Sequence, residues 1–342
     1  MDKLIGTIQA SASQVFSQLN DSFKRDNLTK IFMIIMVIAI IVFYFNRKNS
    51  SEGFNNKNDY IGNQYKSINS NIFDEEYVQL YDNIIVDQEK DHKMIDYIIE
   101  KTGLMHNNGI AVNMGSRTGN INNYLSKQYN IHSIGFDRSR HMIDRSREKY
   151  SNLMRDGTTD FQILNLDTLD SNNVSINSSN PVALILCLNM ELYYHRDIDT
   201  FFSKCYNLLE HGGYLILGLV DYKKFNTTNV YSRINHFNPN NLSIKRVNDS
   251  VVKFNDLVYN TRYRIFPNDF GNDTVWLTET VTNFKDNDSL IKEYIHDFNA
   301  VTNKEIADIA HRNNFQLVNS VDIQLDLGLQ NYNDEYLYIF RK

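Results

Sequence analysis

Residues 110–137, IAVNMGSRTGNINNYLSKQYNIHSIGFD, constrain the fold of this chain more than any other stretch. The apolar run at 110–114 predicts a strand, and Gly115 and Gly119 predict a turn into a helix. A second apolar run follows that helix and ends at Asp137. In such a unit the helix N-terminus can face a polar ligand, and a carboxylate at the end of the second strand commonly accepts hydrogen bonds from ribose hydroxyls. The stretch therefore predicts a binding unit for an adenosine-containing cofactor.

The chain continues to alternate strands with helices after this unit. The run at 182–188, VALILCL, is apolar throughout, as expected of a strand that is buried on both faces. Further strands are predicted at 161–164 and 214–220, and helices at 140–150 and 197–209. This alternation predicts an α/β fold with a doubly wound, mostly parallel sheet.

Residues 221–290 interrupt the alternation. They are rich in Val, Tyr, Phe and Thr that alternate with polar residues, which predicts an antiparallel β insertion. Helical spacing returns at 302–312, and strands are expected at 315–323 and 335–341. We therefore predict that residues 73–342 form one domain, in which the insertion is a cap on the substrate side.

The N-terminal part of the chain predicts a membrane anchor. An uncharged apolar run begins at Ile31 and ends at Phe45, between basic residues, so we expect a transmembrane helix over 28–46. Residues 1–27 have weak amphipathic spacing, and the polar residues 47–72 predict a flexible linker. A cleaved signal peptide is the alternative, but about thirty residues precede the apolar run, and a signal peptide would carry only a short basic segment there.

The charge of the chain disfavours a nucleic-acid partner. The formal net charge is -6, but residues 1–50 carry six Lys and Arg against three Asp, so the remainder is more acidic still. A phosphate backbone requires a basic face. Cys187 and Cys205 are the only cysteines, and their spacing indicates neither a metal site nor a disulfide framework.

Several segments in order resemble the class I S-adenosylmethionine-dependent methyltransferases, from about residue 75 to the C-terminus. AVNMGSRTGN resembles the glycine-rich first motif, IGFDRSRHMIDRSREK the second strand with its acid, and FQILNLDTLD the third strand with its acid. ALILCLNMELYYHRDIDTFFSKCYNLLEHGGYLILGLV is similar to the stretch from the fourth to the fifth strand. FQLVNSVDI and EYLYIFRK resemble the antiparallel last two strands. The resemblance implies a Rossmann-like fold with a seven-stranded sheet.

The resemblance also implies that S-adenosyl-L-methionine is the cofactor. Its amino acid and ribose portions would lie against the loop of Gly115, Ser116 and Gly119, its ribose hydroxyls would bind Asp137, and Phe136 or Arg138 would flank the adenine. Three further contacts would lie at the ends of the third and fourth strands, where they would bind the adenine or face the substrate: Asp167, Thr168 and Asn189.

Two residues depart from the family pattern. An acid is usual where this chain has Asn113, and an amide cannot offer a full charge to the ammonium group of the cofactor. A small residue is usual where it has Arg117. If Arg117 points to solvent, the loop is expected to survive; if it points inward, it would fill the methionine pocket, as in a non-catalytic relative. The dehydrogenase motif GxGxxG is excluded, since it would need glycines at Arg117 and Asn120.

These observations lead us to expect a membrane-anchored methyltransferase that acts on a small-molecule, lipid-like or protein acceptor. The sulfonium already activates the methyl group, so the protein must mainly position the acceptor and exclude water. Tyr194 and His195 are the candidate catalytic residues, and Tyr231 is a further candidate. Trp276 and Glu279 are candidates to line a substrate cavity, although all of these side chains could instead serve packing.

Two alternatives to a small-molecule enzyme stay open. The first is a catalytically inactive, methyltransferase-like scaffold, which Asn113 and Arg117 favour. The second is a nucleic-acid methyltransferase, which the acidic charge disfavours, as does the lack of a Pro-Pro-aromatic run after Asn189. We expect a single-pass membrane protein whose domain is cytosolic, where the cofactor is available, or lies in a virion or host membrane if the protein is viral.

Overall fold

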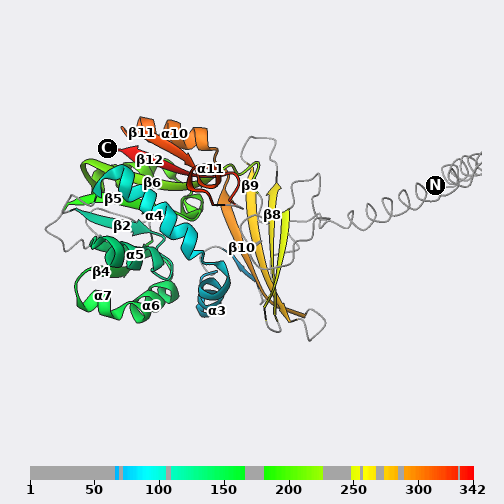
Figure 1. Cartoon of the computed structure of the whole chain (residues 1–342). Coiled ribbons are helices and arrows are strands. Elements are labelled where there is room, and N and C mark those ends of the chain that lie inside the picture. Colours follow the sequence, from blue (N-terminus) through cyan, green and yellow to red (C-terminus); the bar gives the residue numbers. More distant parts are fainter. Residues whose placement is uncertain are drawn as a thin grey trace, which may run out of the picture. The chain divides into compact units, whose positions relative to one another are not determined.

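The structure, a computed structural model, describes residues 66–68, 72–104, 109–165, 181–225, 248–254, 257–266, 273–283, 289–329 and 332–342. All of these residues belong to the unit Asn63–Lys342, and Figure 1 shows them in colour. The predicted N-terminal segment 1–27 and transmembrane helix 28–46 lie outside the described residues. Within the described ranges, no helix is both long and apolar enough to cross a membrane.

Seven strands form a mixed sheet in the order β11-β12-β6-β5-β2-β3-β4. Their bounds are β2 Ile110–Met114, β3 Ser133–Asp137, β4 Thr159–Ile163, β5 Val182–Cys187, β6 Leu209–Val220, β11 Gln316–Asp322 and β12 Glu335–Arg341. The pairs from β4 through β6 are parallel, whereas β12 is antiparallel to both β6 and β11. This arrangement confirms the predicted α/β fold with a mostly parallel sheet.

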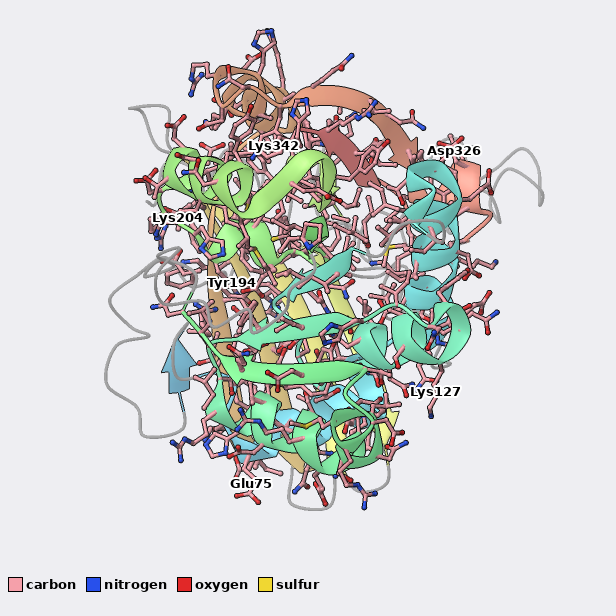
Figure 2. The ribbon with its side chains drawn as sticks, turned by 90° about the vertical axis from the view of Figure 1, so that its left-hand side faces the viewer. Glu75, Lys127, Tyr194, Lys204, Asp326 and Lys342 are labelled. Atoms are coloured by element: carbon pink, nitrogen blue, oxygen red, sulfur yellow. The ribbon has the colours of Figure 1, made fainter. Side chains whose placement is uncertain are left out.

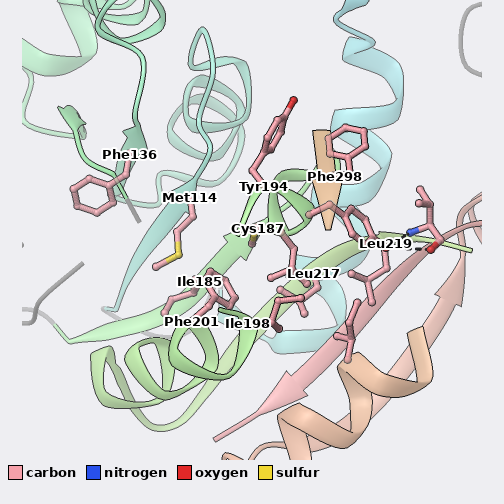
Figure 3. Packing of buried hydrophobic residues seen from close by; sticks show 14 of the residues in the cluster. Met114, Phe136, Ile185, Cys187, Tyr194, Ile198, Phe201, Leu217, Leu219 and Phe298 are labelled. Atoms are coloured by element: carbon pink, nitrogen blue, oxygen red, sulfur yellow. Dashed lines mark hydrogen bonds between the residues drawn. The ribbon is translucent and has the colours of Figure 1, made fainter. Parts of the chain in front are cut away.

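Helices cover both faces of this sheet, as the apolar run of β5 predicts. Leu184 and Leu186 belong to one buried cluster with side chains of α4, α5 and α11. Ile185 and Cys187 belong to a second cluster with α3, α6, α8 and α10, part of which Figure 3 shows. The alternation of side chains along a strand places the two sets on opposite faces. The helices are α3 Glu75–Leu80, α4 Gln88–Thr102, α5 Asn120–Tyr129, α6 Arg140–Lys149, α7 Ser151–Arg155, α8 Ile198–Leu208, α10 Asn303–Arg312 and α11 Ile323–Leu327, with single turns η3 Tyr81–Ile85 and η6 Glu191–Tyr194.

Side-chain caps determine where these helices begin. Asp87, Ser139 and Asp197 each accept a hydrogen bond from a backbone N–H of the first turn, in α4, α6 and α8. Thr302 and Glu305 form a reciprocal capping box at the start of α10. The helices predicted at 197–209 and 302–312 are therefore confirmed to within one residue at each end.

A second sheet has five strands in the order β1-β10-β9-β8-β7. The bounds are β1 Lys66–Ile68, β7 Asn248–Phe254, β8 Leu257–Phe266, β9 Thr274–Asn283 and β10 Ser289–Asn299. Strands β7 to β10 are antiparallel, as predicted, and β1 pairs in parallel with β10.

Two predicted boundaries are wrong. The linker was expected to run to residue 72, but Lys66–Ile68 is strand β1, because β10 offers it an edge, and Ile72 is fully buried. The insertion was expected to end at 290, but β10 continues to Asn299 because it pairs with β9 along its whole length, with Asn299 opposite Thr274.

One face of the second sheet packs against the rest of the described unit. Alternate side chains of β8, β9 and β10 are buried on this face: Tyr259, Thr261, Tyr263, Val275, Leu277, Glu279, Val281, Tyr294, His296 and Phe298. Its apolar members share a core cluster with η6, β6 and α3. Most of this face is apolar or aromatic, so the buried Glu279 and His296 stand out.

Candidate active site

The site lies at the carboxyl ends of the parallel strands, where the loops after β2, β3 and β5 meet the second sheet. In open α/β sheets, ligands bind at this edge. A cavity of about 110 Å³ lies here. It is lined by side chains from α3, from the loops after β2 and β5, and from β9 and β10, among them Tyr77, Arg117, Asn189, Tyr194, Glu279 and His296.

The glycine loop after β2 is tied to the end of β3. The backbone N–H groups of Gly115 and Ser116 both donate to the carbonyl oxygen of Phe136, at 2.8 Å. Gly115 and Gly119 have positive φ angles of 73° and 81°. A Cβ on Gly115 would lie 2.4 Å from Cγ of Glu191, so glycine is required here by a neighbouring side chain of the protein itself.

Arg117 points inward. Its backbone is left-handed, with φ at 52°, which is unfavourable for a residue with a side chain by about 1–2 kcal/mol. Its guanidinium is buried, with Nη2 3.0 Å from Oε2 of Glu191 and Cζ 4.5 Å from the ring centroid of Phe73. Burial opposes the charge, but Glu191, Tyr194 and Asp137 hold the pKa of Arg117 above its ordinary value. The ion pair between Arg117 and Glu191 therefore offsets the backbone strain at Arg117. The side chain of Glu191 lies over Gly115.

Asp137 holds the same loop from the other side. One carboxylate oxygen accepts the backbone N–H of Arg117 and the other that of Ser139, both at 2.9 Å. Burial, together with the charge of Glu191, raises the pKa of Asp137 to about 6, although Arg117 and the two hydrogen bonds oppose this rise. A carboxylate has about four acceptor positions, so each oxygen keeps one for a ligand.

Asn113 lies within the packing of α5 and is not among the residues that line the cavity. Its Nδ2 donates to Oδ1 of Asn122 at 2.8 Å, and Nδ2 of Asn122 donates to the hydroxyl of Ser133 at 3.1 Å. All three side chains are buried. This amide therefore connects β2 to α5 and β3, which is a structural use of the position where the family has an acid.

Asn189 lines the cavity, as its position after the fourth strand predicts. Asn189 and Met190 are consecutive residues with positive φ, at 52° and 64°. Strained backbone of this kind clusters at functional sites. Nδ2 of Asn189 lies 3.3 Å from Oδ1 of Asp91 on α4. Burial raises the pKa of Asp91 to about 6, while Lys90 and Asn189 partly oppose this.

Arg138 follows Asp137 and contacts the aromatic side chains near the cavity. Its Cζ lies 4.3 Å from the ring centroid of Tyr194 and 5.3 Å from that of Phe73. Two of its guanidinium nitrogens, Nε and Nη2, are buried, and neither has a hydrogen-bond partner within the described part of the chain. These donors fit a polar or anionic group of a ligand beside Asp137.

The two predicted catalytic residues have different environments. Tyr194, labelled in Figures 2 and 3, lines the cavity, and its hydroxyl hydrogen-bonds Nδ1 of His296. His195 is buried with its ring stacked on Phe201 at 5.2 Å between centroids, and it does not line the cavity. His195 therefore faces the protein interior, although Tyr194, the residue before it, faces the cavity.

The remaining candidates are divided between the cavity, the packing of the second sheet and the undescribed residues. Glu279 lines the cavity, whereas Trp276 packs against Phe266, with ring centroids 5.0 Å apart. Asp167, Thr168 and Tyr231 lie outside the described residues.

Sequence reasoning did not find Glu191 or His296. Glu191 lies 74 positions from its partner Arg117, and His296 lies beyond the predicted end of the insertion. Alternation of Tyr294, His296 and Phe298 could have extended the strand and placed His296 on the buried face.

Residues 111–213 match the model of a family described as a methyltransferase domain. A search of curated proteins found no match. Among solved structures, an S-adenosylmethionine-dependent methyltransferase from Clostridium acetobutylicum aligns with a TM-score of 0.55 at 17% identity, covering 78% of this chain and 97% of that one. The CcbJ methyltransferase from Streptomyces caelestis aligns with a TM-score of 0.57 at 12% identity, over 77% and 95% of the two chains.

An amino pentose methyltransferase from Micromonospora echinaspora, solved with S-adenosylmethionine bound, aligns with a TM-score of 0.51 at 12% identity, over 79% of this chain and 98% of that one. At these identities the structural likeness shows the fold. Residues 111–213 therefore match a methyltransferase domain, and the described sheet has the strand order and the fold of these S-adenosylmethionine-dependent methyltransferases.

Proposed function

We propose that this protein transfers the methyl group of S-adenosylmethionine to a small-molecule acceptor held in the cavity between the loops and the second sheet. The observation that carries the proposal is the position of this cavity at the carboxyl ends of β2 and β5, with β9 and β10 on its other side. Acceptor pockets in open α/β sheets lie at this edge.

The residues at this edge offer the hydrogen-bond acceptors, donors and charges that the groups of the cofactor would need. Asp137 keeps acceptor positions for the ribose hydroxyls, and Arg138 offers free donors beside it. Arg117 and Glu191 would bind the carboxylate and the ammonium group of the amino acid portion, so Glu191 would supply the charge that Asn113 lacks. When bound, the cofactor supplies a methyl group that its sulfonium makes electrophilic.

Binding requires the ion pair between Arg117 and Glu191 to separate. The pair lies over Gly115, where the side chain of Glu191 would contact any Cβ. Arg117 would then pair with the carboxylate of the ligand and Glu191 with its ammonium group. Because each side chain gains a new partner of opposite charge, the loss of electrostatic free energy is limited. Their surroundings are already desolvated, so they would also exclude water from the reaction.

The cavity supports a small acceptor. Its volume of about 110 Å³ leaves little space for a large ligand, and its lining combines aromatic rings with the carboxyl groups of Asp91 and Glu279. Such a lining suits an amine or a hydroxyl compound. The solved relative from Micromonospora echinaspora, an amino pentose methyltransferase, has a similar fold and supports this class of acceptor.

Anchoring to a membrane is a separate part of the proposal. The uncharged run from Ile31 to Phe45 with its basic flanks supports a single transmembrane helix, and use of S-adenosylmethionine supports a cytosolic domain. Extraction of the full chain by alkaline carbonate would contradict the anchor, and protection of the domain from protease in intact vesicles would contradict its cytosolic side.

The test of the proposed function is incubation of the full chain with methyl-tritiated S-adenosylmethionine and a panel of small amines, amino sugars and phenols. We expect label in at least one acceptor. The scaffold alternative is favoured by one observation, the ion pair that covers Gly115. A folded chain whose melting temperature does not change in millimolar S-adenosylmethionine would support the scaffold and contradict the proposal.

A further inference from the structure

We propose that Tyr194, His296 and Glu279 form a proton relay that deprotonates the methyl acceptor, with the hydroxyl of Tyr194 as the group that touches it. The inference rests on the proposed function and adds the catalytic base of the reaction. His296 and Glu279 belong to the second sheet, so this sheet would take part in the chemistry and not only cover the cavity.

The three side chains form a continuous hydrogen-bonded chain. The hydroxyl of Tyr194 bonds Nδ1 of His296, and Nε2 of His296 lies 2.9 Å from Oε2 of Glu279. The hydroxyl of Tyr259 donates to Oε1 of Glu279 at 2.5 Å. All four side chains are buried, and the three members of the relay line the same cavity.

The charge of Glu279 fixes the direction of the relay. Burial alone would raise the pKa of Glu279, but the neighbouring His296 and hydrogen bonds from His296, Tyr259 and Tyr77 hold it below its ordinary value. An ionised carboxylate only accepts hydrogen bonds, so Nε2 of His296 must carry a proton. When His296 is neutral, the state in which it can take up a proton, Nδ1 is then the acceptor for the hydroxyl of Tyr194. The electrostatic effect of His296 on Glu279 belongs to the protonated state that follows, in which His296 is an imidazolium.

Charged groups from the loops after β2, β3 and β5 and from strand β9 face Tyr194. Burial raises the pKa of this phenol, whereas the guanidinium groups of Arg117 and Arg138 lower it, and Glu191 and Glu279 act in the opposite sense. Around His296, the groups in contact are Tyr194, Glu279 and the rings of other aromatic side chains: Phe73, Tyr77 and Phe298. The two cations favour transient negative charge on Tyr194.

The proton moves in one direction through the relay. The acceptor, an amine or hydroxyl compound, loses its proton to the hydroxyl oxygen of Tyr194 as its nitrogen or oxygen forms a bond to the methyl group. The bond from that methyl group to the sulfonium sulfur breaks, and its electron pair stays on sulfur. The phenolic proton of Tyr194 moves to Nδ1 of His296, and Glu279 stabilises the resulting imidazolium.

A purely structural role explains these contacts less well. A buried carboxylate and imidazole on an apolar sheet face are weak contributors to stability, since hydrophobic residues of similar volume would serve as well or better. Here the pair is joined to a phenol on a different element, η6, and all three reach one cavity. Perturbed ionisable groups that share a cavity are typical of catalytic sites.

The first test needs no cofactor. The full chain is titrated with 4-nitrophenol as a probe of the cavity, and ionisation of the bound phenol is followed by its absorbance. We expect the relay to take up the proton, so the bound probe ionises at least about one pH unit lower than in solution, a tenfold change. Tyr194→Phe and His296→Gln should abolish this change, whereas Tyr193→Phe should preserve it.

Tyr193 is the matched control because it is a buried tyrosine on the same turn whose hydroxyl bonds the backbone of Val220 and which does not line the cavity. Equal ionisation of the probe in the wild type and in Tyr194→Phe would overturn the relay, as would absence of probe binding at millimolar concentration. Neither result depends on S-adenosylmethionine, so failure of the relay is distinguishable from failure of the proposed function.

The second test uses the acceptor identified by the tritium panel. Tyr194→Phe and His296→Gln should lower kcat by about 10²–10⁴-fold and leave the Kd for S-adenosylmethionine within about threefold, the loss typical of a removed general base. Wild-type kcat with an unchanged pH profile in both variants would contradict the proposal.

Discussion

The buried ion pair between Arg117 and Glu191 makes a quantitative prediction about stability. Their side chains are only 9% and 7% exposed, with a distance of 3.0 Å between Nη2 and Oε2. Glu191→Gln leaves a buried guanidinium without its main partner, which typically destabilises a protein by 3–5 kcal/mol. Because Asp137 and the ring of Phe73 stay in contact with Arg117, we expect about 3 kcal/mol, the low end of this range.

Arg117→Gly should have a smaller effect. It also breaks the pair and leaves Glu191 beside Asp137, but glycine relieves about 1 kcal/mol of left-handed backbone strain. We therefore expect a loss of about 2 kcal/mol. In the double variant no unpaired charge is left by the pair, so the loss should again be about 2 kcal/mol, well below the sum of roughly 5 kcal/mol for independent sites.

The assay is urea-induced unfolding of the full chain, followed by fluorescence of Trp276, the only tryptophan. Comparison of the four proteins in a double-mutant cycle gives the coupling energy of the pair, which we expect to be about 3 kcal/mol. Single-variant losses that add to within about 0.5 kcal/mol in the double variant would refute the reasoning.

Three further predictions concern the same region. Burial raises the pKa of Asp91 in the folded protein to about 6, above its ordinary value, so its contribution to stability is present at low pH and lost as the pH rises from about 4 to about 6. Asp91→Asn should flatten this dependence, by roughly 3 kcal/mol over the interval, and an unchanged pH profile of urea unfolding would contradict the assignment. Gly119→Ala should destabilise by about 2–4 kcal/mol, since its φ is 81° and the new Cβ would lie 2.7 Å from Cζ of Phe161; a melting temperature within 1–2 °C of wild type, roughly, would contradict this. Asn113→Ala should cost about 1–3 kcal/mol because it leaves the buried Oδ1 of Asn122 without its donor, and an unfolding free energy within about 0.5 kcal/mol of wild type would count against the network.

The fold could be predicted because its central elements carry local signals. The apolar strands β2 and β5, the glycines of the loop and Asp137 at the end of β3 are short-range patterns, and each has the predicted place in the sheet. Strand β1 carries no such signal. Its three residues, KSI, are a strand only because β10, more than two hundred positions later, offers an edge.

The arrangement of the site could be predicted only in part for the same reason. The departure at Arg117 was visible in the sequence, but its direction depends on Glu191 from the loop after β5. Tyr194 was a candidate, whereas its partner His296 lies 102 positions away on a strand whose end was misplaced. Contacts between distant segments depend on tertiary packing, which the periodicity of a sequence does not encode.

Binding of S-adenosylmethionine tests the central claim most directly. Isothermal titration calorimetry of the full chain should give one site per chain, and Asp137→Asn should weaken it at least about tenfold, because a charge-assisted acceptor for the ribose is lost. Arg138→Ala should weaken it as well, by removal of the free donors beside Asp137. Absence of binding heat at millimolar S-adenosylmethionine in a folded protein, or equal affinity in the wild type and Asp137→Asn, would contradict the account.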